Sequence, residues 1–168
     1  EYREQITKEE MDSFYFMTED TMNRNGGKNA YPTREYFETM LQTFEKFNDK
    51  NKLSIGYFFV YIDGSLASII MVLFFGDTAT YIYGASESKY LKFKTSAYIH
   101  YSAIQKVKEM GFLYYDLGGI DEKRWESLTY FKRQFRGNEK EYIGNVDIVL
   151  KRTHYTLYKV LRFIRHQK

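Results

Sequence analysis

Cysteine is absent from the 168-residue sequence, and proline and histidine are scarce, with one and three residues. Without cysteine the chain has no disulfide, no thiolate zinc site, no iron–sulfur cluster and no cysteine nucleophile. None of the three histidines, His100, His154 and His166, forms a His-x-x-x-His metal pair. These absences favour a protein of a reducing, intracellular compartment.

Long apolar runs are also missing. A membrane-spanning helix needs about 20 apolar residues, whereas the longest candidate run, residues 66–75, has the length of a strand. No signal peptide is visible, and the first residue is not Met, which indicates a domain taken from a longer protein. With 43% hydrophobic and 28% charged residues, the composition is that of one folded domain.

The net charge of +3 is distributed unevenly along the chain. Residues 1–50 carry 7 basic and 11 acidic side chains, whereas residues 121–168 carry 12 basic and 6 acidic ones. From Lys151 onward there are six Lys or Arg residues and no acid. A basic end of this kind suits tRNA, a nucleotide-linked substrate or an anionic membrane. A solvated helix face explains it equally well.

The apolar spacing predicts an α/β fold with a mixed sheet. The expected elements are a helix opened by the capping box Thr7-Lys-Glu-Glu10 and ended by Gly26-Gly27, a helix capped by Thr33, strands over 53–62, 65–75 and 78–84, a helix over 95–110, a strand over 112–117, a helix from Ser127 to Phe135, a strand over 141–149 and a last helix with Leu157, Val160, Leu161 and Ile164 on one face. The helix between the third and fourth strands allows a right-handed crossover, so these strands should be parallel. An antiparallel meander followed by a parallel pair and flanked by helices is typical of the acetyltransferase-like (GNAT) fold.

Acetyl-CoA-binding proteins of that fold carry a glycine-rich loop before the helix that follows the meander. Its backbone N–H groups hold the pyrophosphate of the cofactor. Here the corresponding residues, 86–95, contain no glycine, and none occurs between Gly84 and Gly111. Ordinary CoA binding is therefore disfavoured.

Three segments have candidate chemistry, and each also has a structural interpretation. Residues 81–86 end the third strand, where α/β sheets bind ligands, although strand ends also carry ordinary core tyrosines. Asp116 has the place of a general base, but an Asp at a strand end more often accepts N–H bonds in the turn, which we favour. Lys132 follows Phe131 in a predicted helix, a pair suited to stabilising an anion, whereas most helical lysines are solvated.

Four motifs occur in order between residues 81 and 144. They are Tyr-Ile-Tyr-Gly-Ala-Ser, Tyr-Asp-Leu-Gly-Gly-Ile, Tyr-Phe-Lys-Arg-Gln-Phe-Arg-Gly and Glu-Tyr-Ile-Gly. The set resembles the Fem aminoacyltransferases (the FemABX family), and the flanking elements extend the match over nearly the whole chain. The resemblance implies one GNAT-like domain over residues 1–168, the second half of a two-domain protein whose N-terminal domain is missing here. It also implies transfer of an amino acid from aminoacyl-tRNA to the stem peptide of a peptidoglycan precursor, without a cofactor.

The same resemblance implies roles for individual residues. Lys132 is the expected catalytic residue, which stabilises the oxyanion or the leaving ribose oxygen, and Phe131 meets the acceptor end of aminoacyl-tRNA. Tyr83 stands where the family has a substrate-contacting tyrosine. Arg34 is the expected partner of the precursor's phosphates, and Tyr36 belongs to the same substrate-binding set. No catalytic base is identifiable.

The precursor is either a UDP-muramyl-peptide or a lipid-linked form. We expect a cytoplasmic protein, with peripheral contact to the anionic inner face of the membrane through its basic last helix. Two other interpretations stay open. One is a GNAT-fold N-acyltransferase with an acyl-CoA donor, and the other is a non-catalytic module that binds RNA or a membrane.

Overall fold

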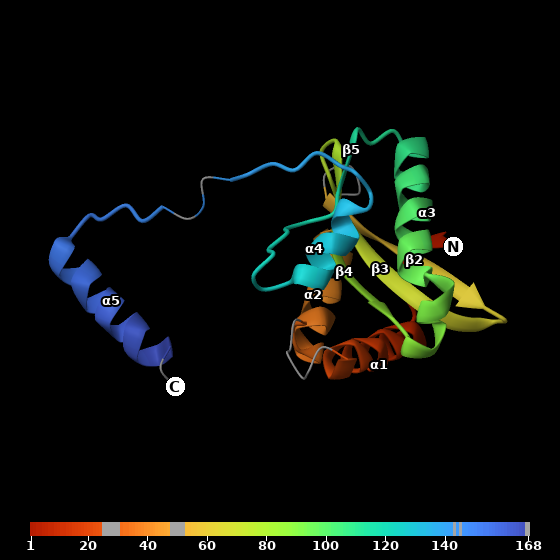
Figure 1. The fold of residues 1–168 in the computed structure, drawn as a ribbon, viewed down its shortest axis with the longest axis horizontal. Helices are drawn as coiled ribbons and strands as arrows, with labels where there is room; N and C mark the ends of the chain where they lie inside the picture. The colour runs from red at the N-terminus through yellow and green to blue at the C-terminus, as the bar shows by residue number, and fades with distance from the viewer. Residues whose placement is uncertain (25–30, 48–52, 143, 145, 167–168) are drawn as a thin grey trace. The chain divides into compact units, whose positions relative to one another are not determined.

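The computed structural model describes residues 1–24, 31–47, 53–142, 144 and 146–166 (Figure 1). The chain forms two compact units, Glu1–Lys132 and Arg133–Lys168. The elements are β1 (Tyr2–Arg3), α1 (Lys8–Arg24), α2 (Arg34–Phe47), β2 (Leu53–Ile62), β3 (Ser65–Phe75), β4 (Thr78–Ser86), the 3-10 helix η1 (Ser88–Phe93), α3 (Thr95–Glu109), β5 (Tyr114–Asp116), α4 (Glu126–Arg133) and α5 (Arg152–His166).

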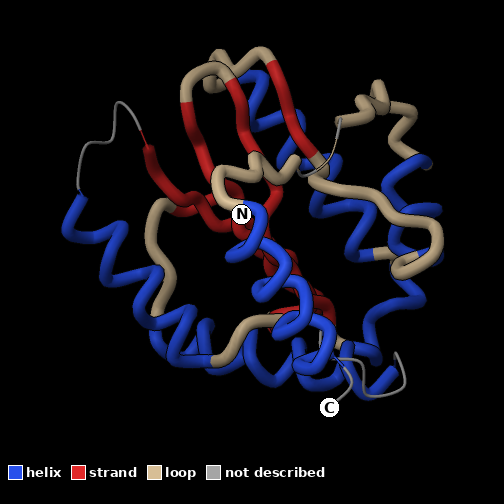
Figure 2. The backbone as a smooth tube through the Cα atoms, turned by 90° about the vertical axis from the view of Figure 1, so that its left-hand side faces the viewer, coloured by secondary structure: helices blue, strands red, loops and turns tan. Residues whose placement is uncertain are grey.

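Strands β2, β3 and β4 form the predicted antiparallel meander, whose strands are red in Figure 2. The turn between β2 and β3 lies at Asp63-Gly64, and both residues have positive φ angles, 49° and 74°. Such a turn matches the right-handed twist of the two strands that it joins. The pair Ile62–Ser65 closes this hairpin, and Phe75–Thr78 closes the next one. Both predicted hairpins are confirmed.

The predicted crossover is also confirmed. Helix α3 connects β4 to β5, which pair in parallel through Thr78–Tyr114, Ala79–Tyr115 and Thr80–Asp116. The five strands follow the order β1-β2-β3-β4-β5. The fold is therefore the expected mixed α/β sheet, an antiparallel meander followed by a parallel pair and flanked by helices.

Each face of the sheet has its own core. One cluster joins α1 and α2 to the sheet and contains Met11, Phe14, Met17, Phe37, Ile55, Tyr57, Phe59, Ile69, Met71 and Ala85. The other joins α3 to the opposite face and contains Phe58, Ile70, Val72, Phe74, Ala79, Ile99, Ala103 and Val107. Residues from β3 alternate between the two clusters, as expected of a strand that is buried on both faces.

The predicted start of each of the first two helices is confirmed. The Glu10 amide donates to Thr7 Oγ1 at 3.2 Å, and the Thr7 amide donates to Glu10 Oε2 at 2.9 Å, which completes the capping box. The Tyr36 amide donates to Thr33 Oγ1 at 3.3 Å at the start of α2. The predicted stop at Gly26-Gly27 lies outside the described residues.

Three expectations about the second half of the chain are wrong. None of the described residues between 141 and 149 forms a strand, and the fifth strand of the sheet is β1, which pairs with Tyr57 and Phe58. Helix α4 begins at Glu126, so Ser127 lies inside its first turn and does not cap it; the helix ends at Arg133, before Phe135. The fourth predicted strand keeps only residues 114–116, because β4 pairs with β5 at those three positions alone.

The second unit contains α5, whose apolar and basic side chains are exposed. Within the described parts of the chain, no helix has both the length and the apolar character needed to cross a membrane.

Candidate functional site

The site lies along β4, at the point where its pairing with β5 ends. Strand β5 ends at Asp116, so within the described residues β4 pairs from Tyr81 onward with β3 alone. A bulge also occurs there, because Met71 pairs with Tyr83 and Val72 with Tyr81, which leaves Ile82 without a partner. An open cavity of about 580 Å³ lies beside this stretch of β4. Residues of α1, β4, α3, α4 and the segment before α4 line it.

One side of the cavity is aromatic. The His100 ring meets the Tyr81 ring edge-on, with 4.6 Å between centroids, and it lies 5.7 Å from the Phe131 ring. Trp125 lines the same cavity. Flat apolar rings of this kind suit stacking with a planar group such as a nucleobase.

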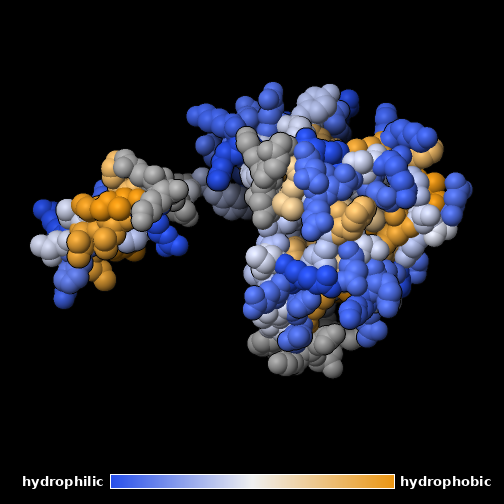
Figure 3. All heavy atoms as spheres, turned by 90° about the horizontal axis from the view of Figure 1, so that it is seen from below, coloured by the Kyte–Doolittle hydropathy of each residue, from blue (hydrophilic) through white to orange (hydrophobic). Residues whose placement is uncertain are grey.

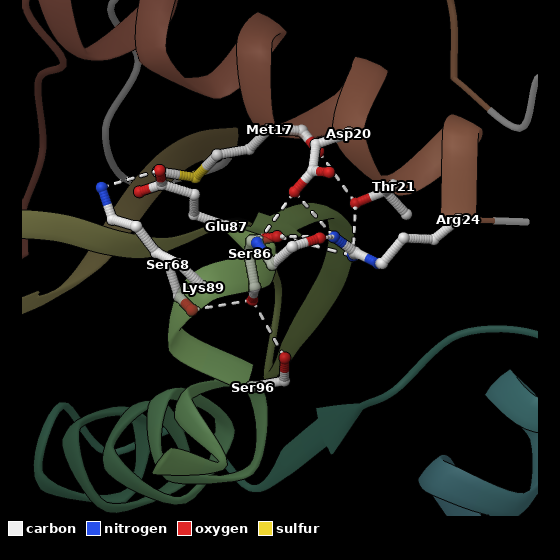
Figure 4. A network of polar contacts seen from close by, with 10 residues as sticks. Met17, Asp20, Thr21, Arg24, Ser68, Ser86, Glu87, Lys89 and Ser96 are labelled. Atoms are coloured by element: carbon white, nitrogen blue, oxygen red, sulfur yellow. Dashed lines mark hydrogen bonds and ion pairs between the residues drawn. The ribbon is translucent and has the colours of Figure 1, made fainter. Parts of the chain in front are cut away.

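Arg24, Ser86 and Ser96 also line the cavity, and they belong to a network of polar contacts at the end of β4 (Figure 4). The Arg24 guanidinium donates to Asp20 Oδ2 at 2.8 Å and to the Ser86 carbonyl at 3.5 Å. The Ser86 hydroxyl accepts from Ser68 Oγ at 2.7 Å and lies 2.9 Å from Ser96 Oγ. Asp20 thus pairs with Arg24 at the end of β4, and the cavity is also lined by Arg124 and Glu126.

Lys132 is not one of the residues that line the cavity, but its neighbours Phe131 and Tyr81 do line it. Its side chain is buried, with the residue 8% exposed, and Nζ donates to the Gly119 carbonyl at 2.8 Å. The ammonium lies 5.9 Å from the centroid of the Tyr81 ring. Burial lowers the pKa of Lys132, and the nearby Asp116 carboxylate raises it in opposition. Lys132 is therefore not a solvated helical lysine.

His100 is the other buried titratable group of the site. Its Nδ1 lies 3.0 Å from the Tyr115 hydroxyl. Burial, and to a lesser extent the positive charge of Lys132, lower the pKa of His100 to about 4. Burial likewise raises the pKa of Tyr81 and of Tyr115. At neutral pH Lys132 is thus the cationic group among these four side chains.

The low pKa of His100 predicts a loss of stability in acid. An unfolded histidine has a pKa of about 6.5, so between that pH and about 4 the unfolded chain binds a proton that the folded chain does not. The free energy of unfolding should therefore fall as pH decreases through this window, by up to about 3 kcal/mol. Urea unfolding of His100→Gln at several pH values should show a flatter dependence, whereas His154→Gln, at an exposed histidine, should keep the steep one.

Tyr83 and Tyr36 lie on the opposite face of the sheet from His100. The Tyr83 ring packs against Phe37 at 4.8 Å, and Tyr83 belongs to the cluster under α1 and α2. Burial raises the pKa of Tyr83 to about 12, helped by its hydrogen bond to Tyr36. The bulge at Ile82 explains this placement, because it breaks the alternation that would give Tyr81 and Tyr83 the same face.

Arg34 lies at the start of α2 in a separate setting. Its guanidinium binds Asp12 and Glu38, the latter at 3.0 Å, and lies 4.6 Å from the centroid of the Tyr15 ring. These partners raise the pKa of Arg34, first of all the hydrogen bond with Glu38. The structure therefore brings together Phe131 and Lys132, but places Tyr83 with Tyr36 and keeps Arg34 at its own site. All five assignments stay predictions.

The sequence motifs missed Arg24, His100 and Trp125. Arg24 and His100 lie in helices, where a single polar residue does not by itself indicate a functional role. Trp125 could have been singled out in the sequence, because it is the single tryptophan of the chain and directly follows Arg124.

The fold defines the structural class of the chain. It is similar to a possible acetyltransferase from Clostridium difficile 630, with a TM-score of 0.60 and 14% identity, over 90% of this chain and 98% of that one. It is also similar to glucosamine-6-phosphate N-acetyltransferase from Arabidopsis thaliana, with a TM-score of 0.52 and 11% identity, over 88% and 98% of the two chains. At these identities the likeness shows the fold alone, which is that of the GNAT acetyltransferases.

The family follows from the sequence. The model of the FemAB family matches residues 62–162, so the chain belongs to this family, as its motifs indicated. The chain is 30% identical over 108 residues to the lipid II:glycine glycyltransferase of Staphylococcus haemolyticus (strain JCSC1435), covering 61% of this chain and 25% of that protein. It is 25% identical over 143 residues to the lipid II:glycine glycyltransferase of Staphylococcus aureus (strain USA300), covering 82% and 31%. The chain thus spans less than a third of the length of these relatives.

Proposed function

We propose that the protein is an aminoacyltransferase that moves an amino acid from aminoacyl-tRNA to the stem peptide of a lipid-linked peptidoglycan precursor. The observation that carries the proposal is the buried ammonium of Lys132 beside Tyr81 and Phe131, two rings that line a cavity to which Arg24 and Arg124 also belong. Membership of the FemAB family supports the reaction class. The names of the staphylococcal relatives support the lipid-linked acceptor.

The donor is an ester between the amino acid and the terminal ribose of the tRNA. An amine of the stem peptide attacks the ester carbonyl, so that a C–N bond forms and the carbonyl oxygen becomes negative. The C–O bond to the ribose then breaks; the amine loses a proton and the ribose oxygen gains one. The Lys132 ammonium donates to the oxyanion or to the leaving oxygen, and its dry surroundings strengthen that interaction. Its hydrogen bond to Gly119 holds it in place.

The cavity receives the end of the donor tRNA. Trp125, Phe131 and Tyr81 offer rings for stacking with the terminal base, and such stacking contributes about 1–3 kcal/mol per base. Arg124, which also lines the cavity, attracts an adjoining phosphate. The cavity thus supplies the shape and the charge that a single-stranded RNA end requires.

The proposal is tested with the full-length protein. Labelled aminoacyl-tRNA is supplied with a muramyl-pentapeptide precursor in its nucleotide-linked or lipid-linked form, and label in the precursor is measured. We expect transfer to the lipid-linked form, and none when free amino acid and ATP replace the charged tRNA. Turnover of an acyl-CoA, with no transfer from aminoacyl-tRNA to either precursor, would favour an acyl-CoA-dependent N-acyltransferase instead.

We further propose that α5 contacts the anionic inner face of the membrane, where a lipid-linked acceptor lies. Hydrophobic side chains gather along one side of this helix, seen in orange at the left of Figure 3; among them are Leu157, Val160, Leu161 and Ile164, each at least half exposed. Arg152, Lys159, Arg162 and Arg165 are also exposed, and α5 contains no acid. An amphipathic basic helix of this kind binds anionic bilayers.

Charge reversal in α5 should weaken that contact. Each basic residue near an anionic surface contributes about 1 kcal/mol, so Arg162→Glu with Arg165→Glu should lower binding to phosphatidylglycerol vesicles by more than about tenfold in sedimentation assays. The control is Lys106→Glu with Lys108→Glu in α3. Equal binding by the α5 variant and the control variant would contradict the contact.

A further inference from the structure

The turn after β5 is built by the carboxylate of Asp116. Asp116 Oδ1 accepts the Gly118 amide at 2.7 Å, which makes an Asx turn. Gly118 has a φ of +76°, a left-handed conformation that residues with a Cβ rarely adopt. The next residue, Gly119, provides the carbonyl that accepts from Lys132 Nζ at 2.8 Å. The position of the ammonium therefore depends on a turn that Asp116 closes.

The turn also lies close to the ammonium. A Cβ added to Gly118 would lie 3.5 Å from Lys132 Nζ and 3.5 Å from the Tyr81 carbonyl. The Gly118 backbone thus fills the space between β4 and the lysine. Among the described residues, no acceptor other than the Gly119 carbonyl is found for the ammonium.

Two neutral rings and one carboxylate lie near the ammonium. Tyr81 from β4 and His100 from α3 are neutral near pH 7, because burial raises the pKa of the first and lowers that of the second. Asp116, at the end of β5, provides the negative charge that acts on Lys132, and it opposes the effect of burial. Asp116 itself is exposed to solvent.

We propose that Asp116 is a positioning residue for Lys132. Through the Asx turn, Asp116 presents the Gly119 carbonyl to the ammonium of Lys132. Through its carboxylate, Asp116 compensates the charge of that ammonium. This inference rests on the proposed function of Lys132. It gives Asp116 two separable tasks, one of geometry and one of charge. Because Asp116 acts through Lys132, it needs no contact with substrate.

Two substitutions separate the tasks. Asp116→Asn keeps an oxygen that accepts the Gly118 amide but removes the charge. Gly118→Ala keeps the charge but places a Cβ where φ is positive and where Lys132 Nζ lies at 3.5 Å. The pH dependence of transfer is measured for both variants in the full-length protein. The titration of Lys132 is followed independently by NMR with ¹³C-labelled lysine, its signal assigned with Lys132→Arg, and thermal unfolding checks that each variant folds.

For Asp116→Asn we expect the Lys132 titration and the alkaline limb of the kcat profile to move together to lower pH, with KM unchanged. For Gly118→Ala we expect kcat to fall by about tenfold or more at every pH, because a small displacement of a catalytic group is costly. If the Lys132 titration is unchanged in Asp116→Asn, the carboxylate does not compensate the charge of Lys132. If kcat is unchanged in folded Gly118→Ala, the turn does not position the ammonium. If the titration moves but the wild-type protein transfers nothing, the link between Asp116 and Lys132 stands and the proposed function fails.

Discussion

Lys132→Met should lower the rate of aminoacyl transfer by about 100- to 1000-fold. Removal of one donor that stabilises a developing oxyanion has an effect of this size in other acyl-transfer enzymes, because the interaction strengthens as charge develops. The KM for aminoacyl-tRNA should change little, since Phe131 lines the cavity whereas the buried Lys132 does not. Single-turnover transfer from labelled aminoacyl-tRNA measures the chemical step directly.

The methionine variant should remain folded. Methionine fills nearly the volume of the lysine side chain, and replacing a buried charge by an apolar group is often neutral or stabilising. Its former hydrogen-bond partner is the carbonyl of Gly119, an exposed residue whose carbonyl can bind water instead, and Asp116 is exposed as well. Lys108→Met, at an exposed lysine of α3, is the matched control and should transfer at the wild-type rate. If the Lys132→Met protein retains a transfer rate within tenfold of wild type, the Lys132 ammonium does not contact the reacting atoms.

The meander could be predicted because its signals are local. Asp63-Gly64 requires no partner beyond the two strands that it joins, and both of its φ angles are positive as this dipeptide permits. The capping box at Thr7 and Glu10 is equally local, since its two hydrogen bonds connect residues three apart. Signals of this kind depend on the chain's own neighbours and can therefore be identified in a sequence.

The strand expected over 141–149 shows that a local sequence pattern alone does not determine whether a strand forms. Tyr142, Val146, Ile148 and Leu150 alternate as a strand requires, and all four are at least 70% exposed. Alternation gives the face of a strand but not its neighbour, and a strand forms only against another edge. The two-residue strand β1 is the reverse case, because it pairs with β2 although its own sequence is too short to show a period.

The site could be predicted only in part. The motif around Lys132 made the lysine and Phe131 candidates, and both stay predictions. The placement of the lysine ammonium depends on the turn at Gly118 and Gly119, about 13 residues away in sequence. Tyr81 and Tyr83 are two residues apart and would share a face in a regular strand, whereas the bulge at Ile82 directs them to opposite sides of the sheet. A bulge of this kind arises from pairing with β3, so the sequence of β4 alone does not reveal it.

The core under α1 holds the sheet that carries the site. Phe14 is fully buried, and its ring meets Phe37 from α2 at 5.3 Å and Tyr31 at 6.4 Å, both nearly edge-on. Phe37 in turn packs on Tyr83 of β4 at 4.8 Å. The Tyr31 hydroxyl donates to the Gly84 carbonyl at 2.8 Å, at the edge of the cavity. Phe14 therefore supports both helices and, through them, the cavity side of β4.

Phe14→Ala should lower the free energy of unfolding by about 3–5 kcal/mol, because it removes a buried ring and leaves a cavity that the surrounding side chains fill only partly. Phe16, two residues away on the same helix, is 62% exposed, so Phe16→Ala should change this free energy by no more than about 0.5 kcal/mol. Both values come from urea unfolding followed by circular dichroism. Equal effects at the two positions would mean that α1 does not pack on the sheet through Phe14. The predicted difference would instead mean that the packing of α1 on the sheet holds Arg24, in the last turn of α1, at the cavity.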